Sequence, residues 1–250
     1  MLDTDIIVIA TAAFLLGGFV KGVVGLGLPT VSLAILTATV GLKEAMVLML
    51  FSSFVTNAWQ ALIGGHLLVI LRRLWVFLVI GAFGIWIAAG WLAKSDAVLL
   101  SGVFGVLLCI YGAVSLFGRS LPPPGRAERW LSPVVGGVAG IITGLTGSFT
   151  VPGIMYLQSL GLAKDVFIQA MGVVFTMSTL TLGFSLAAND LMPVNLGIVS
   201  VAGLVPAALG MIAGQRIRGR LSEEQFRKVF FASLLVVGAY IAARAVTTFL

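Results

Sequence analysis

Two strings in the sequence combine clustered glycines with a proline and small hydroxyl residues, residue types from which an anion site can be built. They are GFVKGVVGLGLPTV, from Gly18 to Val31, and GVAGIITGLTGSFTVPG, from Gly137 to Gly153. Glycine allows backbone angles closed to other residues and lets a ligand approach the chain closely. A proline fits the first turn of a helix, where its missing N–H would have no partner. Helices that begin after such breaks would point free N–H groups and positive dipole ends at a small anion.

Polar side chains near these strings are the candidate ligands. Ser53, Thr56 and Asn57 have the spacing i, i+3 and i+4, which puts them on one face of a helix. Their hydroxyl and amide groups can hydrogen-bond an oxyanion, although such groups also join neighbouring helices in membranes. The predicted substrate-binding residues are Lys21, Gly25, Gly27, Thr30, Ser53, Thr56, Asn57, Gly144, Thr146, Gly147, Ser148, Gln169 and Thr176.

The composition indicates that these residues lie in a membrane. Of the 250 residues, 60% are hydrophobic and 10% are charged, whereas a soluble domain has about 25% charged residues. Residues 74–93 and 97–118 carry no charge, and each run is long enough to cross a bilayer as a helix. The runs are apolar on all sides, unlike the alternating strands of a membrane barrel. The sequence therefore predicts an all-α, polytopic membrane bundle with broken or re-entrant helices.

Ten hydrophobic segments are expected, in two sets of five. They lie near residues 5–24, 29–41, 45–63, 74–93, 97–117, 131–145, 149–161, 165–188, 193–215 and 226–249. Three consecutive prolines follow the fifth segment and cannot continue a helix. The predicted organisation is a first transmembrane repeat (1–117), a cytoplasmic linker (118–130) and a second transmembrane repeat (131–250). The number of full spans is left open, because the short segments could be re-entrant.

The two sets share a residue pattern. Gly17, Gly18, Gly25 and Leu26 recur 119 positions later as Gly136, Gly137, Gly144 and Leu145. An odd number of crossings per set turns the second set upside down, which gives two inverted repeats. Basic residues cluster in 64–73, 118–130 and 216–228, so these loops are expected in the cytoplasm, with 94–96 and 189–192 outside. An anion site is then expected near the midplane, between the two glycine-rich breaks.

The charged residues narrow the function further. Lys21 is the one basic residue inside a break, so it could bind an anion; alternatively, it could extend to the cytoplasmic interface. The nine acidic residues lie near segment ends, and His66 is the only histidine, so no metal or catalytic cluster is expected. The sequence predicts no enzyme activity, no cofactor and no nucleic-acid partner. The expected partners are a small anionic substrate and the lipid bilayer, and the oligomeric state is left open.

The glycine strings, the proline after each, and the turns Gly41-Leu42 and Gly161-Leu162 resemble the TauE/SafE family of membrane proteins, called sulfite exporters. The resemblance covers nearly the whole chain, although family members often have a run of glycines where this chain has GLGLP and GLTGS. It implies a secondary transporter of sulfite, sulfoacetate or other organosulfonates across the cytoplasmic membrane, and the halves would rearrange to expose the site alternately. The alternative is a channel for anions or small solutes.

Overall fold

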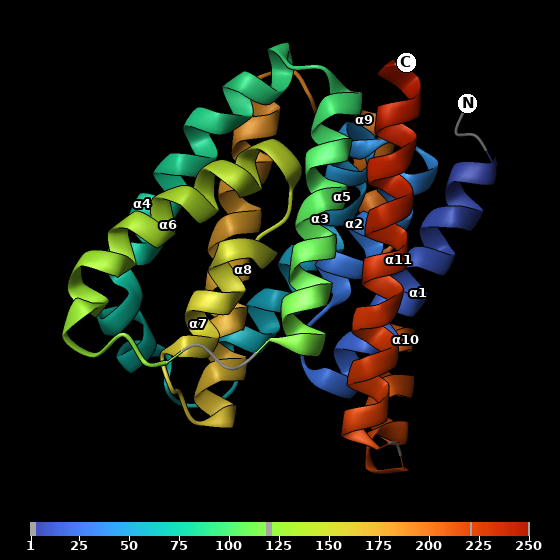
Figure 1. Cartoon of the computed structure of the whole chain (residues 1–250). Helices are drawn as coiled ribbons and strands as arrows, with labels where there is room; N and C mark the ends of the chain where they lie inside the picture. The colour runs from blue at the N-terminus through green and yellow to red at the C-terminus, as the bar shows by residue number, and fades with distance from the viewer. Residues whose placement is uncertain (1–3, 119–121, 221, 250) are drawn as a thin grey trace. The chain divides into compact units, whose positions relative to one another are not determined.

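The computed structural model describes residues 4–118, 122–220 and 222–249, and all regular elements in these ranges are helices (Figure 1). Seven helical stretches of the described chain, with Val194–Arg220 counted as one, are long and apolar enough to cross a membrane. The prediction of an all-α polytopic membrane bundle is confirmed. In chain order the elements are α1 (Thr4–Val24), α2 (Leu28–Thr39), α3 (Leu42–Leu62), α4 (Leu67–Lys94), α5 (Ala97–Phe117), η1 (Gly125–Ala127), α6 (Glu128–Thr146), η2 (Thr150–Ile154), α7 (Met155–Ser159), α8 (Lys164–Ala188), α9 (Val194–Ala202), α10 (Leu204–Ile217), η3 (Arg218–Arg220) and α11 (Glu223–Phe249).

The helix boundaries follow the predicted segments, with three differences. Helix α4 begins at Leu67, well before the apolar run, so Arg72 and Arg73 lie on a helix rather than in a loop. The ninth segment is divided into α9 and α10 at Gly203, where the ring of Phe14 occupies the place of a side chain. The seventh segment is two short pieces, η2 and α7. Residues 119–121 of the predicted linker lie outside the described residues.

The chain forms two compact units, and each takes helices from both predicted repeats. The first unit contains α1, α2, the first half of α3, α5, α9, α10 and α11. The second unit contains the rest of α3 together with α4, α6, α7 and α8. The predicted repeats therefore exchange helices, since each compact unit is completed by segments far away in the sequence.

In the second unit, glycines lie where α4 and α6 cross, and they allow the two backbones to come close together. A Cβ atom on Gly136 would lie 2.7 Å from the carbonyl oxygen of Phe77, and one on Gly144 would lie 2.6 Å from that of Ile85. Between these points, a Cβ atom on Gly140 would meet the Gly81 carbonyl. The contacts advance by four residues on both helices, so α4 and α6 run parallel. Such spacing of small residues lets two membrane helices pack backbone against backbone.

The first unit repeats this arrangement with the equivalent segments exchanged. A Cβ atom on Gly18 of α1 would meet the carbonyl of Ala207 on α10, and one on Gly22 would meet that of Met211. These contacts also advance by four residues on both helices, so α1 and α10 run parallel. In both units, therefore, the first segment of one predicted repeat packs along the fourth segment of the other.

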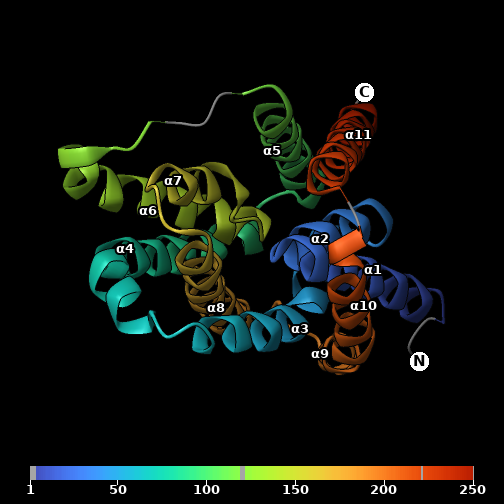
Figure 2. The ribbon, with the colours of Figure 1, turned by 90° about the horizontal axis from the view of Figure 1, so that it is seen from below.

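Helices α5 and α11 are the fifth segments of the two predicted repeats, and they lie side by side (Figure 2). A Cβ atom on Gly105 would lie 2.7 Å from the Gly238 carbonyl oxygen, and one on Gly112 would lie 2.9 Å from that of Phe231. The contact positions rise along α5 as they fall along α11, so these equivalent helices are antiparallel. Antiparallel packing of equivalent helices is what an inverted repeat requires. The inverted repeat itself stays a prediction, which these pairings favour.

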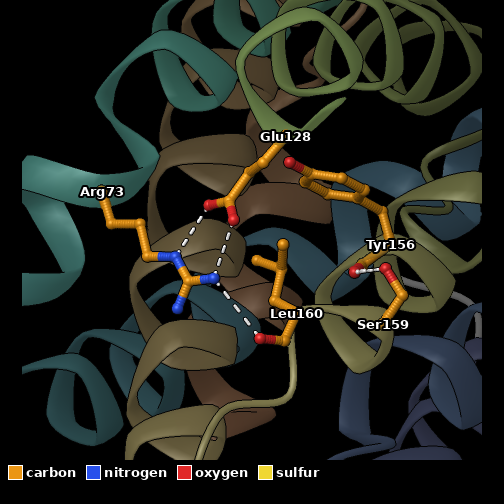
Figure 3. Close-up of polar contacts among 5 residues, drawn as sticks. All are labelled: Arg73, Glu128, Tyr156, Ser159 and Leu160. Carbon is orange, nitrogen blue, oxygen red and sulfur yellow. Dashed lines mark hydrogen bonds and ion pairs between the residues drawn. The ribbon is translucent and has the colours of Figure 1, made fainter. Parts of the chain in front are cut away.

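An ion pair joins the beginnings of α4 and α6 (Figure 3). Arg73 donates from Nε to Oε1 of Glu128 over 2.7 Å and from Nη2 to Oε2 over 2.8 Å. Nη2 also donates to the carbonyl oxygen of Leu160 over 3.4 Å, which connects this pair to the end of α7. The hydrogen bonds from Arg73 lower the pKa of the Glu128 carboxyl, which precedes the apolar part of α6. The bidentate geometry fixes both helix ends in one orientation.

The glycine crossing makes a testable claim about folding. Gly140→Ala places a methyl group on the Gly81 carbonyl, and neither backbone can move without separating α4 from α6. We expect a loss of about 1–3 kcal/mol, the usual cost of overpacking. The matched control is Gly197→Ala on α9, because nothing lies within 4 Å of a Cβ atom there. Thermal unfolding in mild detergent measures both variants, and equal stability of the two would contradict a packing role for Gly140.

Candidate functional site

The first break lies between α1 and α2. Gly25 and Gly27 have φ angles of 82° and 118°, a region that favours glycine, so the predicted interruption is present at the predicted residues. Pro29 lies at the start of α2, and Gly27 provides no side-chain cap. The first N–H groups of a helix have no partner within it. The N–H groups of Leu28 and Thr30 can therefore donate to a ligand.

Lys21 lies one turn before this break, and its carbonyl oxygen accepts a 2.8 Å hydrogen bond from the Gly25 N–H. Only 4% of its surface is exposed. This burial disfavours extension to an aqueous interface, where the ammonium group would be exposed. Thr30, in the first turn of α2, is also buried. The first unit thus holds four of the predicted residues around one break: Lys21, Gly25, Gly27 and Thr30.

The second break follows α6. Gly147 adopts a left-handed conformation with φ of 70°, and its N–H donates to the Thr143 carbonyl oxygen over 2.7 Å. Four residues later, Val151 has the extended angles φ −120° and ψ 129°, so the chain is kinked within η2. The residues before this kink leave regular helical geometry. The predicted interruption is therefore present in the second unit too.

Four buried hydroxyl side chains surround the second break. The Ser148 hydroxyl lies 2.8 Å from the Thr150 hydroxyl, and the Ser148 N–H donates to Thr146 Oγ1 over 3.3 Å. Thr143 Oγ1 donates to the carbonyl oxygens of Ala139, over 2.7 Å, and of Ser148, over 3.2 Å. Thr143 and Thr150 are not among the predicted ligands, although Thr143 lies one turn before Gly147. Together these hydroxyls form a small polar cluster that can donate and accept hydrogen bonds.

The polar face predicted on α3 is present and buried. Ser53, Thr56 and Asn57 all lie in the interior, and Thr56 Oγ1 donates to the Ser53 carbonyl oxygen over 3.3 Å. The Ser53 side chain is completely buried, and its hydroxyl has no hydrogen-bond partner among the described residues. A buried hydroxyl without a partner costs free energy unless something else bonds it. The Ser53 hydroxyl can therefore donate to a ligand without losing a bond within the described chain.

Three predicted site residues have structural contacts within the second unit. Gln169 accepts from the His66 N–H over 2.9 Å and donates to the Ala61 carbonyl oxygen over 2.8 Å, so it completes the end of α3. Thr176 donates to the Gly172 carbonyl oxygen of its own helix over 2.6 Å. Gly144 packs on Ile85 in the helix crossing described above. These contacts explain why the three residue types occur at these positions without a ligand, and binding by them stays a prediction.

The predicted residues divide between the two units. Ser53, Thr56, Asn57, Gly144, Thr146, Gly147, Ser148, Gln169 and Thr176 belong to the second unit. Among these, Thr146, Gly147 and Ser148 lie together at the break, whereas Gln169 is bonded elsewhere, at the end of α3. Within the described chain, no group of three or more His, Cys, Asp or Glu side chains gathers to hold a metal ion. The chemistry available at both breaks is hydrogen-bond donation, with one cationic side chain at the first.

Interrupted membrane helices with buried hydrogen-bond donors at the breaks are typical of membrane transporters. The chain belongs to the sulfite exporter TauE/SafE family, whose model matches residues 9–241. No curated protein matches the chain, and no solved structure does. The family consists of membrane transporters of small sulfur-containing anions rather than enzymes. Family membership and the seven apolar helices make this a multi-pass membrane protein.

Gln169 offers a test that separates structure from binding. Gln169→Leu removes the partners of two backbone groups, and we expect a loss of about 1–3 kcal/mol in stability, the cost of unsatisfied buried polar groups. Thr176→Val removes only a hydrogen bond within one helix turn, and its effect should stay within about 0.5 kcal/mol. Thermal unfolding of the purified variants measures both. An unchanged stability for Gln169→Leu together with lost anion binding would make Gln169 a ligand instead.

Proposed function

We propose that this protein exports small sulfur-containing oxyanions, namely sulfite, sulfoacetate or other organosulfonates, across the cytoplasmic membrane by alternating access. Family membership supports the transport of sulfur anions. The two interrupted helices support a site for such anions, because paired breaks in the two halves of a transporter mark where substrates bind. The single observation that carries the binding proposal is the buried Ser53 hydroxyl, which has no partner among the described residues.

The donors at the breaks match the chemistry of these substrates. Sulfite and sulfonate groups present oxygens that accept hydrogen bonds, and their charge must be compensated when water is removed. In the second unit, the hydroxyls of Ser53, Ser148 and Thr150 can donate to these oxygens. In the first unit, the N–H groups at the start of α2 can donate to them, and Lys21 would supply a positive charge there. Because the hydroxyls also accept hydrogen bonds, they can remain paired with one another when no anion is bound, as Ser148 and Thr150 are.

Alternating access is supported by the way the units are built. Each compact unit combines helices from both predicted repeats and is closed by glycine crossings in which backbones touch. Such tightly packed groups of helices can move as rigid bodies, which is how many secondary transporters expose one site to each side in turn. A channel needs no such movement. Saturable transport without single-channel currents distinguishes the proposed mechanism from the channel.

Ser53→Ala tests the binding proposal directly. The substitution removes a hydroxyl that has no partner among the described residues, so the stability of the protein should not fall. The affinity for sulfite or a sulfonate should fall by about 0.5–1.5 kcal/mol, the value of one hydrogen bond. Calorimetry on purified protein measures the affinity. Thr179→Val is the matched control, because its hydroxyl already donates to the carbonyl of Phe175. Full affinity in Ser53→Ala would remove Ser53 from the site.

Lys21 is tested by changing its charge and then restoring it. Lys21→Met keeps an apolar stem of similar length, and we expect anion affinity to fall by about 1–3 kcal/mol, the range for hydrogen bonds to a charged group. Lys21→Arg retains the charge and should keep more of the affinity than Lys21→Met. Transport of radiolabelled sulfite in proteoliposomes should follow the same order. Equal affinity of Lys21→Met and the unchanged protein would show that this buried lysine does not bind the substrate.

A further inference from the structure

An arginine-rich pocket lies outside both breaks, where α4 and α6 begin in the second unit. Its volume is 840 Å³. The lining includes Arg73, Arg126 and Arg129 as its basic residues, Glu128 as its acidic residue, and the rings of Trp75 and Trp130. Three arginines and one glutamate give the lining a net charge of +2. The pocket therefore favours an anionic ligand.

Two of the three arginines are available to such a ligand. The Arg73 guanidinium is already held by both oxygens of Glu128. Arg126 and Arg129 are exposed, and neither forms an ion pair with a carboxylate among the described residues. Two arginines three residues apart at the start of a helix point to the same side. Both guanidinium groups can therefore reach one phosphate.

The surface beside the pocket is apolar, which a water-soluble anion does not need. Trp75 of α4 is 61% exposed, and Val79 and Phe83 are exposed at the next two positions spaced by four. On α6, Trp130 is 79% exposed, and Val134 and Val138 follow with the same spacing. These two rows of exposed residues form two apolar stripes. Because α4 and α6 run parallel, both stripes extend from the pocket in the same direction. Tryptophans next to arginines are typical of the interface between lipid headgroups and acyl chains.

We propose that this pocket binds the headgroup of an anionic phospholipid, with its acyl chains lying along the two apolar stripes. Arg126 and Arg129 bind the phosphate, and the tryptophan rings lie at the level of the glycerol backbone. Basic pockets on the cytoplasmic side of membrane helices are suited to such lipids, and the sequence predicts that this end of the second unit faces the cytoplasm. The site is separate from the two breaks, and it does not depend on the identity of the transported anion.

The test compares phosphatidylglycerol, phosphatidylcholine and inorganic phosphate added to delipidated protein in detergent. Native mass spectrometry counts bound lipid, and thermal unfolding measures stabilisation. We expect phosphatidylglycerol to bind and to raise the unfolding temperature, whereas phosphatidylcholine and phosphate at the same concentration do neither. R126Q/R129Q should bind phosphatidylglycerol about 25-fold more weakly, since each basic residue near a charged membrane surface is worth about fivefold.

Two matched variants complete the experiment. R216Q/R218Q removes the same charge from the end of α10 and should bind phosphatidylglycerol like the unchanged protein. R126K/R129K keeps the charge and should retain most of the binding; if R126Q/R129Q does not fold, R126Q alone is compared with R126K. Equal binding of phosphatidylcholine, equal stabilisation by phosphate, or undiminished lipid binding in the glutamine variants would each overturn the proposal.

Discussion

The hydrocarbon core of a membrane supplies no water to backbone groups that lose their helical partners, so each interrupted helix must satisfy its own polar groups. At the second break this is done by side chains: Thr143 donates to the Ser148 carbonyl, and Thr146 accepts from the Ser148 N–H. At the first break, glycines with positive φ angles turn the chain, and α2 begins at Leu28 with Pro29 in its first turn. The same groups that make these breaks tolerable in a membrane are hydrogen-bonding groups that a polar substrate can use.

Glycine has two uses in this protein that a sequence pattern does not separate. Gly25 and Gly27 have positive φ angles, as expected for positions where the chain turns. Gly144 was expected to have an equivalent role in the second half, but it lies in a helix and faces Ile85 across a crossing. Both uses require the absence of a side chain, so glycine occurs in the sequence in both cases. Only the backbone angle and the neighbouring helix distinguish a turn from a close crossing.

The extent of the helices was predictable because it depends on local hydrophobicity, and both breaks were predictable because glycine and proline act locally. The pairing of helices was not predictable, since it depends on contacts between residues such as Gly81 and Gly140 that are far apart in the chain. The structural contacts of Gln169 were not predictable for a similar reason. A buried amide at helical spacing suits a ligand or the end of a neighbouring helix, and its partners Ala61 and His66 are more than 100 residues away.

Helix α3 contributes residues to both compact units, so its two halves have different surroundings. Before the boundary, the Ser52 hydroxyl donates to the Ser200 carbonyl oxygen over 3.0 Å in the first unit. After it, the Gln60 amide donates to the Ile168 carbonyl oxygen over 2.7 Å in the second. The first half of α3 is thus hydrogen-bonded within the first unit and its last turns within the second unit. Ser53, the candidate ligand with the unused hydroxyl, is the first residue after the boundary. An anion bound to Ser53 would contact the middle of α3, and a ligand that binds one arrangement of a helix better than another shifts the equilibrium between the two arrangements.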